Sequence, residues 1–412
     1  MYNVHFVFLL SCRVFVLMLK SYPMSPSCQN HSSFSVLAFV TLAMLFLPVA
    51  MASPPLAPPS PPSVGAGGYL LMDYYSGSVL VDKNTDKRVP PASLTKMMTS
   101  YVVFSELKAG NLTPEEEVLI SEKAWRTPGS RTFLEVNTHV PVEILLKGMI
   151  VQSGNDASVA LAEHIAGDEA VFAQRMNQEA KRLGLTRTNF VNATGLPDDN
   201  HYTTARDMAI LGIALIRDFP ELYKLHAIKS YEYNNIKQFN RNKLLWRDES
   251  VDGIKTGHTE AAGYCLVAAA RKDGMRLLSV VMDADSVKSR TEAARSLLRY
   301  GFRFFETHRL YTGGAVISTV PVWKGKSDTL EVGVKDDLYI TVPARRQESA
   351  IRADMQVNAL ITAPITEGKV YGKIRVLLDD ELLLERPVIA LQSVPEGGMW
   401  KKAFDSIRLY FH

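Results

Sequence analysis

The sequence predicts an α/β domain with helices packed on an antiparallel sheet, followed by a small all-β sandwich and a C-terminal amphipathic helix. Apolar strand patterns stand at both ends of a mainly helical region, which favours such a first domain. After residue 308 the hydrophobic residues alternate with period two, and near the C-terminus they recur every three or four residues. With 412 residues, 47% of them hydrophobic, the chain can bury a core in each of two domains.

Residues 1–52 are expected to be a signal peptide or leader. The apolar run Ser35–Val49 is too short to span a bilayer comfortably, and it leads into Ala50-Met51-Ala52, a small-x-small cleavage site. A further apolar run at Phe6–Leu19 leaves two alternatives open. Translation could begin at Met18, which gives the usual signal-peptide polarity, or the two runs could form a double membrane anchor.

Residues 53–68 are rich in Pro and Gly and are expected to be a semi-stiff linker. The first folded domain is expected over residues 69–308. It begins with two apolar segments, Tyr69–Asp73 and Val79–Val81, which flank a Ser-Gly turn and predict a β-hairpin. The dipeptide Pro90-Pro91 then ends the strand region and begins a helix.

The remainder of this domain is predicted to be helical first and extended later. Helical patterns dominate residues 113–190, and Asp207–Arg217 is expected to be a further helix. Two strands, Cys265–Ala270 and Leu277–Met282, flank an Asp-Gly hairpin turn. A closing helix is expected over Glu292–Glu306.

The C-terminal part is expected to contain two further modules. Residues 309–394 alternate in period two and predict a separate β-sandwich, with a role as a spacer or docking module. Residues 395–412 predict an amphipathic helix that lies on a membrane surface. Its aromatic stripe consists of Trp400, Phe404, Ile407 and Phe411. The preceding Gly397-Gly398 favours a hinge, and the alternative is a helix docked on the β domain.

Charge and cysteine content exclude several classes of function. The formal net charge is +3, and a nearly neutral chain argues against nucleic acid as a partner. Of three cysteines, only Cys265 lies beyond the predicted leader, so no intrachain disulfide is expected. Cys265 is expected to be a small buried hydrophobe in a strand. No group of residues has metal-ligand spacing, so we expect neither a metal nor a cofactor.

Three short motifs carry the chemistry. Ser93 and Lys96 lie three residues apart at the start of a helix and can therefore reach each other. This spacing alone is weak, because Ser105 and Lys108 repeat it where a solvated helix end is expected. Ser153-Gly154-Asn155 follows in a break between helices, and Lys255-Thr256-Gly257 follows at the expected start of a strand. The order of these motifs is the signature of penicillin-binding proteins and class A β-lactamases.

The motifs suit acyl transfer to a serine. Ser93 becomes a good nucleophile once a neutral Lys96 removes its proton, and burial or a nearby cation such as Lys255 can keep Lys96 neutral. Ser153 can pass a proton to the leaving amine, and Asn155 can bond both Lys96 and a substrate carbonyl. Glycine in the third motif, Gly257, would let a substrate strand approach the sheet edge. The backbone N–H groups of Ser93 and His258 are candidates for the oxyanion hole.

The chain resembles the serine-type D-alanyl-D-alanine carboxypeptidases of the low-molecular-mass, type-5 penicillin-binding class over roughly residues 66–412. The likeness extends beyond the three motifs to five segments and the amphipathic tail. The segments are Pro91–Thr99, Gln152–Asp156, Asn240–Asn242, Asp252–Thr259 and Gly301–Glu306. The resemblance implies a catalytic domain of the β-lactamase/transpeptidase type, with a helical subdomain, a β domain and a C-terminal membrane anchor.

The resemblance also implies the reaction and the substrate contacts. Ser93 would be acylated as the terminal D-alanine leaves a peptidoglycan stem peptide, and β-lactams would bind Ser93 covalently. Arg241, with Thr256, would hold the terminal carboxylate, since Arg binds carboxylates with two parallel hydrogen bonds. Arg290 matches a further basic position. The protein would act in peptidoglycan maturation and cell shape from the periplasm, anchored to the outer face of the inner membrane.

Two segments depart from the family pattern, and three other functions stay open. Met282–Ser286 is more acidic than expected and the loop Pro128–Thr132 is altered, which could tune substrate range or deacylation. A β-lactamase of class A would need an acid in the region Thr188–Leu196, which contains none. A D,D-endopeptidase is harder to separate from a carboxypeptidase. A non-catalytic wall-binding scaffold would not need the intact Ser93 and Lys96.

Overall fold

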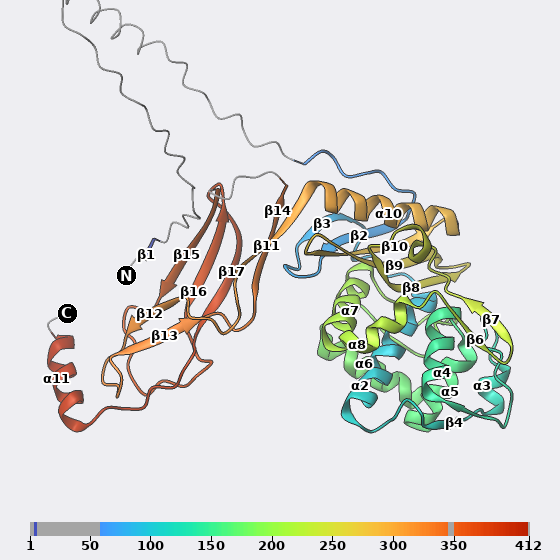
Figure 1. Ribbon diagram of the computed structural model, residues 1–412, viewed down its shortest axis with the longest axis horizontal. Helices are drawn as coiled ribbons and strands as arrows, with labels where there is room; N and C mark the ends of the chain where they lie inside the picture. The colour runs from blue at the N-terminus through green and yellow to red at the C-terminus, as the bar shows by residue number, and fades with distance from the viewer. Residues whose placement is uncertain (1–3, 6–57, 345–349, 411–412) are drawn as a thin grey trace, which may run out of the picture. The chain divides into compact units, whose positions relative to one another are not determined.

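The computed structural model describes residues 4–5, 58–344 and 350–410 (Figure 1). The predicted cleavage site, most of the predicted leader and the first part of the linker lie outside these ranges. The described residues fall into two compact units. The larger unit comprises residues 58–344, 362–369 and 389–410, and the smaller one comprises residues 4–5, 350–361 and 370–388.

The catalytic domain contains a five-stranded sheet in which every neighbouring pair is antiparallel. In spatial order the strands are β3 (Val79–Lys83), β2 (Gly68–Asp73), β10 (Met275–Ala284), β9 (Gly263–Lys272) and β8 (Val251–Thr259). The β9–β10 turn has positive φ at Asp273 and Gly274, as a tight primed hairpin turn requires. Both predicted hairpins and the antiparallel sheet are therefore confirmed.

Helices cover both faces of this sheet. On β10, Leu278 and Val280 pack into a core shared with the helical subdomain, whereas Leu277 and Val281 pack into a second core with α10 (Val287–Phe304). This alternation is the period-two pattern of a strand buried on both sides. Figure 1 shows α10 on one face of the sheet and the helical subdomain on the other.

The helical subdomain lies between β3 and β8 in the chain. Its longer elements are α2 (Lys96–Ala109), α4 (Val142–Lys147), α5 (Asn155–Ala166), α6 (Glu169–Leu183) and α7 (Ala205–Asp218). Its short helices are η1 (Ala92–Thr95), α3 (Glu122–Arg126), η2 (Gly148–Gln152), α8 (Pro220–Tyr223), η3 (Lys224–Ala227) and α9 (Leu244–Arg247). Side-chain oxygens of Ser121, Asp168 and Thr204 cap α3, α6 and α7 and fix where these helices begin.

Several predicted boundaries were wrong. The closing helix α10 begins at Val287, earlier than predicted, because Ser286 caps it by accepting from the Ser289 N–H. It ends at Phe304, and Phe305 already belongs to a strand. Two short antiparallel strand pairs interrupt the region expected to be helical or irregular. β6 (Ser230–Tyr233) and β7 (Ile236–Phe239) form one hairpin. β4 (Glu117–Leu119) and β5 (His139–Pro141) pair antiparallel across a longer segment that contains α3.

The chain after α10 is rich in strands, as predicted for the β domain. In the larger unit, β11 (Phe305–Tyr311) pairs with β14 (Leu338–Pro343), and β12 (Ser318–Pro321) pairs with β13 (Thr329–Gly333). In the smaller unit, β15 (Ile351–Val357), β16 (Val370–Leu378) and β17 (Glu381–Ala390) form an antiparallel set, and β1 (Val4–His5) adds to β15.

The C-terminal helix α11 (Met399–Tyr410) is docked through its polar side, so the predicted hinge at Gly397-Gly398 was wrong. Asp405 is 2% exposed and accepts a hydrogen bond from the Lys324 backbone N–H at 2.7 Å. Lys401 bridges Asp405 and Asp328. Among the residues that the structure describes, no helix is both long enough and apolar enough to cross a membrane.

Candidate active site

Ser93 lies in a tight turn at the start of α2. The preceding residue, Ala92, has a φ of 47°, an uncommon value for a residue with a side chain. Ala92 is buried, whereas Ser93 is half-buried. One turn of 3₁₀ helix therefore presents Ser93 beside Lys96, the first residue of α2.

Lys96 is fully buried, and its Nζ has three hydrogen-bond partners. It lies 3.2 Å from Ser93 Oγ, 2.7 Å from Asn155 Oδ1 and 2.6 Å from the Thr194 carbonyl oxygen. Burial, and after it the Arg241 charge, lower the pKa of Lys96 to about 7. A neutral amine has two N–H groups and one lone pair. Because the Asn155 and Thr194 oxygens can only accept, the lone pair of neutral Lys96 faces Ser93.

The second and third motifs meet on the other side of the site. Ser153 has a φ of 68° between η2 and α5, and this left-handed conformation places its side chain opposite β8. Lys255 is 2% exposed and donates to Ser153 Oγ at 3.0 Å and to the Thr256 carbonyl at 3.1 Å. Burial and then the nearby charge of Lys96 lower the pKa of Lys255. Lys255 lies in the middle of β8, not at its start as predicted.

Asn155 joins the first two motifs and is held by the altered loop. Its Nδ2 donates to the Pro128 carbonyl at 2.6 Å, while its backbone N–H donates to the Ser130 carbonyl at 2.7 Å. The neighbouring Asp156 carboxylate accepts from the backbone N–H groups of residues 132, 133 and 134. The loop therefore fixes the amide that bonds Lys96. Neither the Pro128 contact nor the Asp156 contacts were predicted from the sequence.

The structure gives Gly257 a packing role that was not predicted from the sequence. A Cβ there would lie 3.1 Å from the Pro91 carbonyl oxygen and 3.3 Å from atoms of Ala92 and Leu94. The missing side chain lets β8 pack closely against the Ser93 turn. The space is filled by this chain, so Gly257 positions the strand against the nucleophile.

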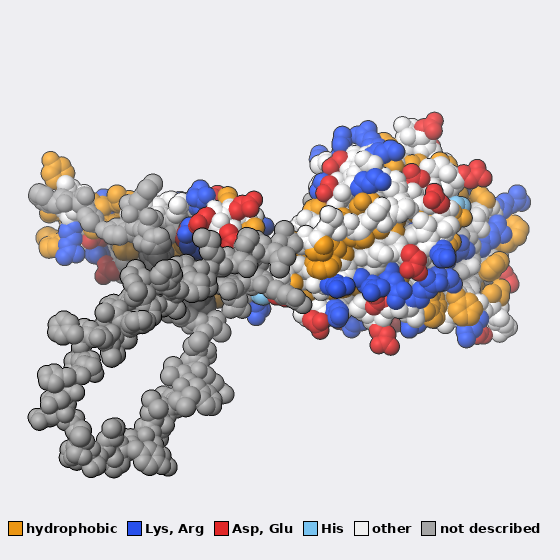
Figure 2. Space-filling model, turned by 90° about the horizontal axis from the view of Figure 1, so that it is seen from above, with side chains coloured by type: hydrophobic (Ala, Val, Ile, Leu, Met, Phe, Trp, Pro, Cys, Tyr) orange, Lys and Arg blue, Asp and Glu red, His pale blue; other side chains and the backbone are white. Residues whose placement is uncertain are grey.

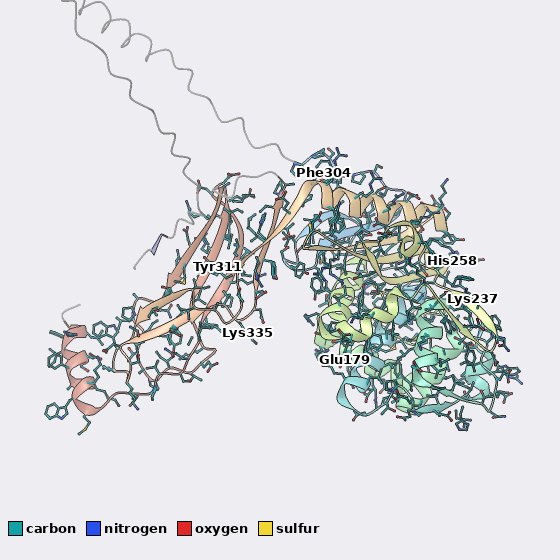
Figure 3. All side chains as sticks on the ribbon, in the orientation of Figure 1. Glu179, Lys237, His258, Phe304, Tyr311 and Lys335 are labelled. Carbon is teal, nitrogen blue, oxygen red and sulfur yellow. The ribbon has the colours of Figure 1, made fainter. Side chains whose placement is uncertain are left out.

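Arg241, Thr256 and His258 complete the predicted substrate-binding group around this edge. Arg241 is exposed between two buried asparagines, Asn240 and Asn242, which anchor the loop to the Ile228 and Gly253 carbonyls. Thr256 is buried, with 4% of its surface exposed. His258 is exposed and stacks on Tyr264 with ring centroids 4.0 Å apart. Figure 3 shows His258 on the same side of the catalytic domain as Lys237 of β7.

Arg290, the remaining predicted substrate-binding residue, is buried, unlike the exposed Arg241 and His258. It is 5% exposed, and its Nη1 donates to the carbonyls of Gly257 at 2.8 Å and Cys265 at 3.2 Å. Its guanidinium also lies over the Tyr264 ring. Burial lowers the pKa of Arg290 to about 10. Arg290 thus braces β8 and β9 through their backbones.

Two further predictions were confirmed, the burial of Cys265 and the position of the second Ser-x-x-Lys spacing at a helix end. Cys265 is fully buried in β9, where burial raises the pKa of its thiol to about 11. The second Ser-x-x-Lys spacing lies at the end of α2, where Ser105 bonds the Tyr101 carbonyl and Lys108 bonds the exposed end of α7 at Asp218. Within the described ranges, no cluster of three or more His, Cys, Asp or Glu side chains could hold a metal ion.

Comparison with known proteins identifies the family. A sequence model of the D-alanyl-D-alanine carboxypeptidases matches residues 56–286, and a model of the C-terminal domain of penicillin-binding protein 5 matches residues 305–396. The D-alanyl-D-alanine carboxypeptidase DacA of Escherichia coli is 43% identical over 358 residues, which cover 85% of this chain and 89% of that protein. The chain belongs to the D-alanyl-D-alanine carboxypeptidase family. Membership confirms the predicted enzyme class, a serine-type carboxypeptidase that binds β-lactams.

Solved structures agree on the fold. Penicillin-binding protein 5 from Haemophilus influenzae has a TM-score of 0.79 and 44% identity, covering 82% of this chain and all of that one. Penicillin-binding protein D2 from Listeria monocytogenes, solved in its ampicillin-bound form, has a TM-score of 0.54 and 30% identity. It covers 58% of this chain and all of that one. These similarities confirm the predicted transpeptidase-like catalytic domain followed by a β-sandwich.

Proposed function

We propose that this carboxypeptidase removes the terminal D-alanine from peptidoglycan stem pentapeptides through an acyl-enzyme on Ser93, with Lys96 as the base. One observation carries the proposal. Lys96 is buried, its pKa is lowered to about 7, and two obligatory acceptors direct its lone pair toward Ser93 Oγ. A base of this pKa is half deprotonated near neutral pH, where general-base catalysis is most efficient.

The reaction has two steps. The Ser93 oxygen attacks the carbonyl between the two terminal D-alanines while its proton passes to Lys96. The C–N bond then breaks, and the leaving amine takes a proton through Ser153, which Lys255 orients from 3.0 Å. The backbone N–H groups of Ser93 and His258 stabilise the oxyanion. Water finally hydrolyses the ester and releases the shortened peptide.

Recognition of a chain end falls to Arg241. Its exposed guanidinium lies near enough to lower the pKa of both buried lysines, after burial itself. There it can pair with the free carboxylate of the terminal D-alanine, with the Thr256 hydroxyl as a second donor. Arg290 supports the same edge from behind, through the Gly257 carbonyl.

A β-lactam follows the same path up to the ester. Its amide is cyclic, so the leaving group stays attached after the ring opens and can obstruct water. A long-lived penicilloyl ester on Ser93 is therefore expected. The acid-free turn at residues 192–196 offers no carboxylate that could activate a deacylating water, which disfavours a β-lactamase.

The C-terminal helix supports attachment to a membrane surface. Its apolar residues are exposed while its polar side is docked, and hydrophobic and basic side chains lie together on the surface of α11 (Figure 2). The exposed residues are Met399, Trp400, Phe404, Ile407 and Tyr410. We place the enzyme in the periplasm, held at the outer face of the inner membrane by this helix.

The test is release of D-alanine from a pentapeptide that ends in D-Ala-D-Ala. The purified wild-type protein should release free D-alanine, and Ser93→Ala should release none. A crosslinked peptide dimer, assayed in parallel, measures any D,D-endopeptidase activity. Equal release by both proteins would refute the catalytic role of Ser93, and no release by either would leave the non-catalytic scaffold alternative.

A further inference from the structure

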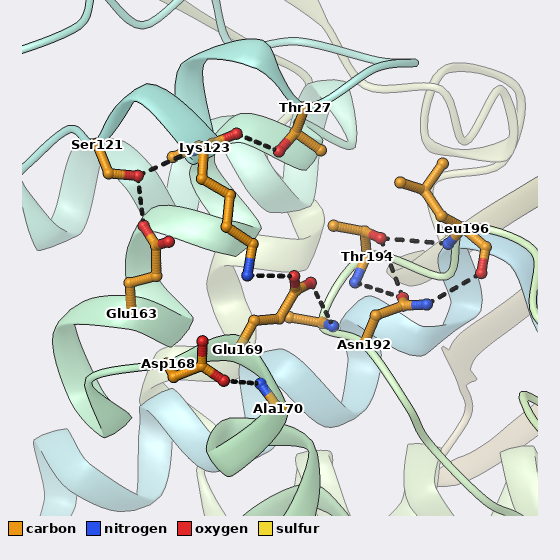
Figure 4. A network of polar contacts seen from close by, with 12 residues as sticks. Ser121, Lys123, Thr127, Glu163, Asp168, Glu169, Ala170, Asn192, Thr194 and Leu196 are labelled. Carbon is orange, nitrogen blue, oxygen red and sulfur yellow. Dashed lines mark hydrogen bonds and ion pairs between the residues drawn. The ribbon is translucent and has the colours of Figure 1, made fainter.

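The Thr194 carbonyl that accepts from Lys96 belongs to a turn, residues 192–196, which we call the Thr194 turn. The side chain of Asn192 holds this turn together (Figure 4). Its Oδ1 accepts from the Thr194 N–H at 3.1 Å and from the Gly195 N–H at 2.7 Å, and its Nδ2 donates to the Leu196 carbonyl at 3.0 Å. The Thr194 hydroxyl also donates to Asn192 Oδ1 at 3.0 Å.

Two helices fasten the Thr194 turn from outside. Glu169, the first residue of α6, accepts from the Ala193 N–H at 3.1 Å, and its other oxygen lies 3.2 Å from Lys123 Nζ on α3 (Figure 4). On α2, Thr99 donates to the Ala193 carbonyl at 2.7 Å. The Glu169 side chain is 14% exposed, and that of Lys123 is 51% exposed. The turn therefore receives a fixed position and a nearby negative charge with an exposed counter-ion.

We propose that Asn192 and Glu169 are positioning residues for acylation, and that Lys123 offsets the negative charge that Glu169 presents to Lys96. The inference rests on the roles proposed for Ser93 and Lys96. The lone pair of neutral Lys96 faces Ser93 only while its two N–H groups have acceptors in the right places. One acceptor is the Thr194 carbonyl, so a displaced turn rotates the lone pair away from the nucleophile.

Charges on several elements surround Lys96. Arg241, after β7, lowers its pKa, whereas Asp156 on α5 and Glu169 on α6 raise it. Lys255 on β8 couples to Lys96, and His201 is buried with its pKa lowered to about 4, so it stays neutral. Among these groups Glu169 offers a clean test, because Glu169→Gln removes the charge and keeps an acceptor for the Ala193 N–H.

The experiment measures acylation by a fluorescent penicillin as a function of pH in the full-length protein. Wild-type acylation should rise as Lys96 loses its proton, with a midpoint near its pKa of about 7. Glu169→Gln should move this midpoint down by about half a pH unit, and Lys123→Gln should move it up by about as much. Arg126→Gln removes a charge from the same helix, where Arg126 pairs with Glu122 in the solvent, and should leave the midpoint unchanged.

The role of Asn192 is tested by the rate of acylation. Asn192→Ala should slow acylation about 100-fold at the pH plateau, and Asn192→Asp, which keeps the acceptor oxygen, should restore part of the loss. Equal midpoints in wild type, Glu169→Gln and Lys123→Gln, or shifts of the same sign, would overturn the proposal, and so would a wild-type rate in Asn192→Ala. If Asn192→Ala does not fold, the two charge variants still decide. A wild type that penicillin does not acylate would instead refute the role of Ser93.

Discussion

At the residue scale, the chemistry depends on the protonation state of one buried amine. Lys96 as an ammonium would donate to all three of its neighbours, including Ser93 Oγ. Burial disfavours that charged form and brings the pKa to about 7, so a large fraction is neutral at physiological pH. In the neutral form the contact with Ser93 reverses direction, because the serine now donates. The same geometry thus serves both before and after proton transfer.

Arg241 provides a prediction about specificity. In wild type, a peptide ending in D-Ala-D-Ala carboxylate should be cleaved far faster than its amidated counterpart, since the carboxylate pairs with the guanidinium. Arg241→Gln should reduce this preference about 10- to 100-fold, the range of a hydrogen bond to a charged group. The measurement is kcat/KM on both peptides.

Lys237→Gln is the control for Arg241. It removes another exposed cation from the neighbouring strand β7 and should leave the preference intact. A full preference for the carboxylate in Arg241→Gln would show that another group recognises the chain end.

At the element scale, the Thr194 turn and the Ser93 turn are packed against each other at Gly195. This glycine has a φ of 83°, and a Cβ on it would lie 1.8 Å from the Ala92 carbonyl oxygen. Gly195→Ala should therefore displace one of the two turns and abolish most acylation. Gly184→Ala is the matched control, because it has a φ of 78° but open space around its Cβ.

The two glycine variants separate the cost of a positive φ from the cost of a steric clash with a neighbouring residue. Gly184→Ala should cost about 1 kcal/mol, lower the melting temperature by about 2–4 °C and keep the acylation rate. Gly195→Ala should lower the melting temperature further. Equal melting temperatures and equal acylation rates in the two variants would contradict the close packing of the two turns. Thermal melts followed by circular dichroism, with penicillin labelling, make the comparison.

Sequence patterns identify candidate site residues where the side chain itself is expected to carry the function. The sequence motifs mark Ser93, Lys96 and Lys255 by residue type and spacing, and the structure brings these side chains together. The strands around Asp273 follow from period-two hydrophobicity and were predicted correctly. The role of the Thr194 carbonyl was not predicted. Because every residue has a backbone carbonyl, the residue type does not indicate which carbonyl accepts a hydrogen bond from Lys96. An Asn-x-x-Gly sequence at residues 192–195 was the available signal for that turn.

Other failures have equally local causes. The start of α10 depends on the Ser286 cap, which lies before the hydrophobic stripe used to predict the helix. The contact of Gly257 with the Ser93 turn was not predicted, because the two segments are far apart in the sequence. Helix α11 is held in place through Asp405, which is buried. The aromatic stripe used to predict this helix gave no indication that Asp405 would be buried.

At the scale of the whole molecule, α11 is held by its polar side and exposes its apolar side. Trp400 is 89% exposed and Phe404 is 64% exposed, which is costly in water and favourable at a membrane interface. Deletion of residues 399–412 should therefore move the protein from the lipid to the aqueous fraction when it is mixed with anionic vesicles and sedimented.

Substitutions distinguish membrane binding by α11 from membrane binding through other exposed hydrophobic residues. The double variant Trp400→Ser, Phe404→Ser should also stay in the aqueous fraction. Val370→Ser with Leu382→Ser removes two exposed apolar residues, 53% and 46% exposed, from the β domain and should leave vesicle binding unchanged. Vesicle binding that survives the deletion would place the membrane contact elsewhere in the chain.

The role of Ser93 as the nucleophile is tested most directly by the site of β-lactam attachment. After brief incubation with benzylpenicillin, mass spectrometry of the whole protein and of its peptides should find one intact penicillin added, on the peptide that contains Ser93. Lys96→Arg, which cannot become neutral, should show little adduct at any pH between 6 and 9, about 100-fold less or lower. An adduct on another residue such as Ser105, or an undiminished adduct in Lys96→Arg, would contradict the assignment of nucleophile and base.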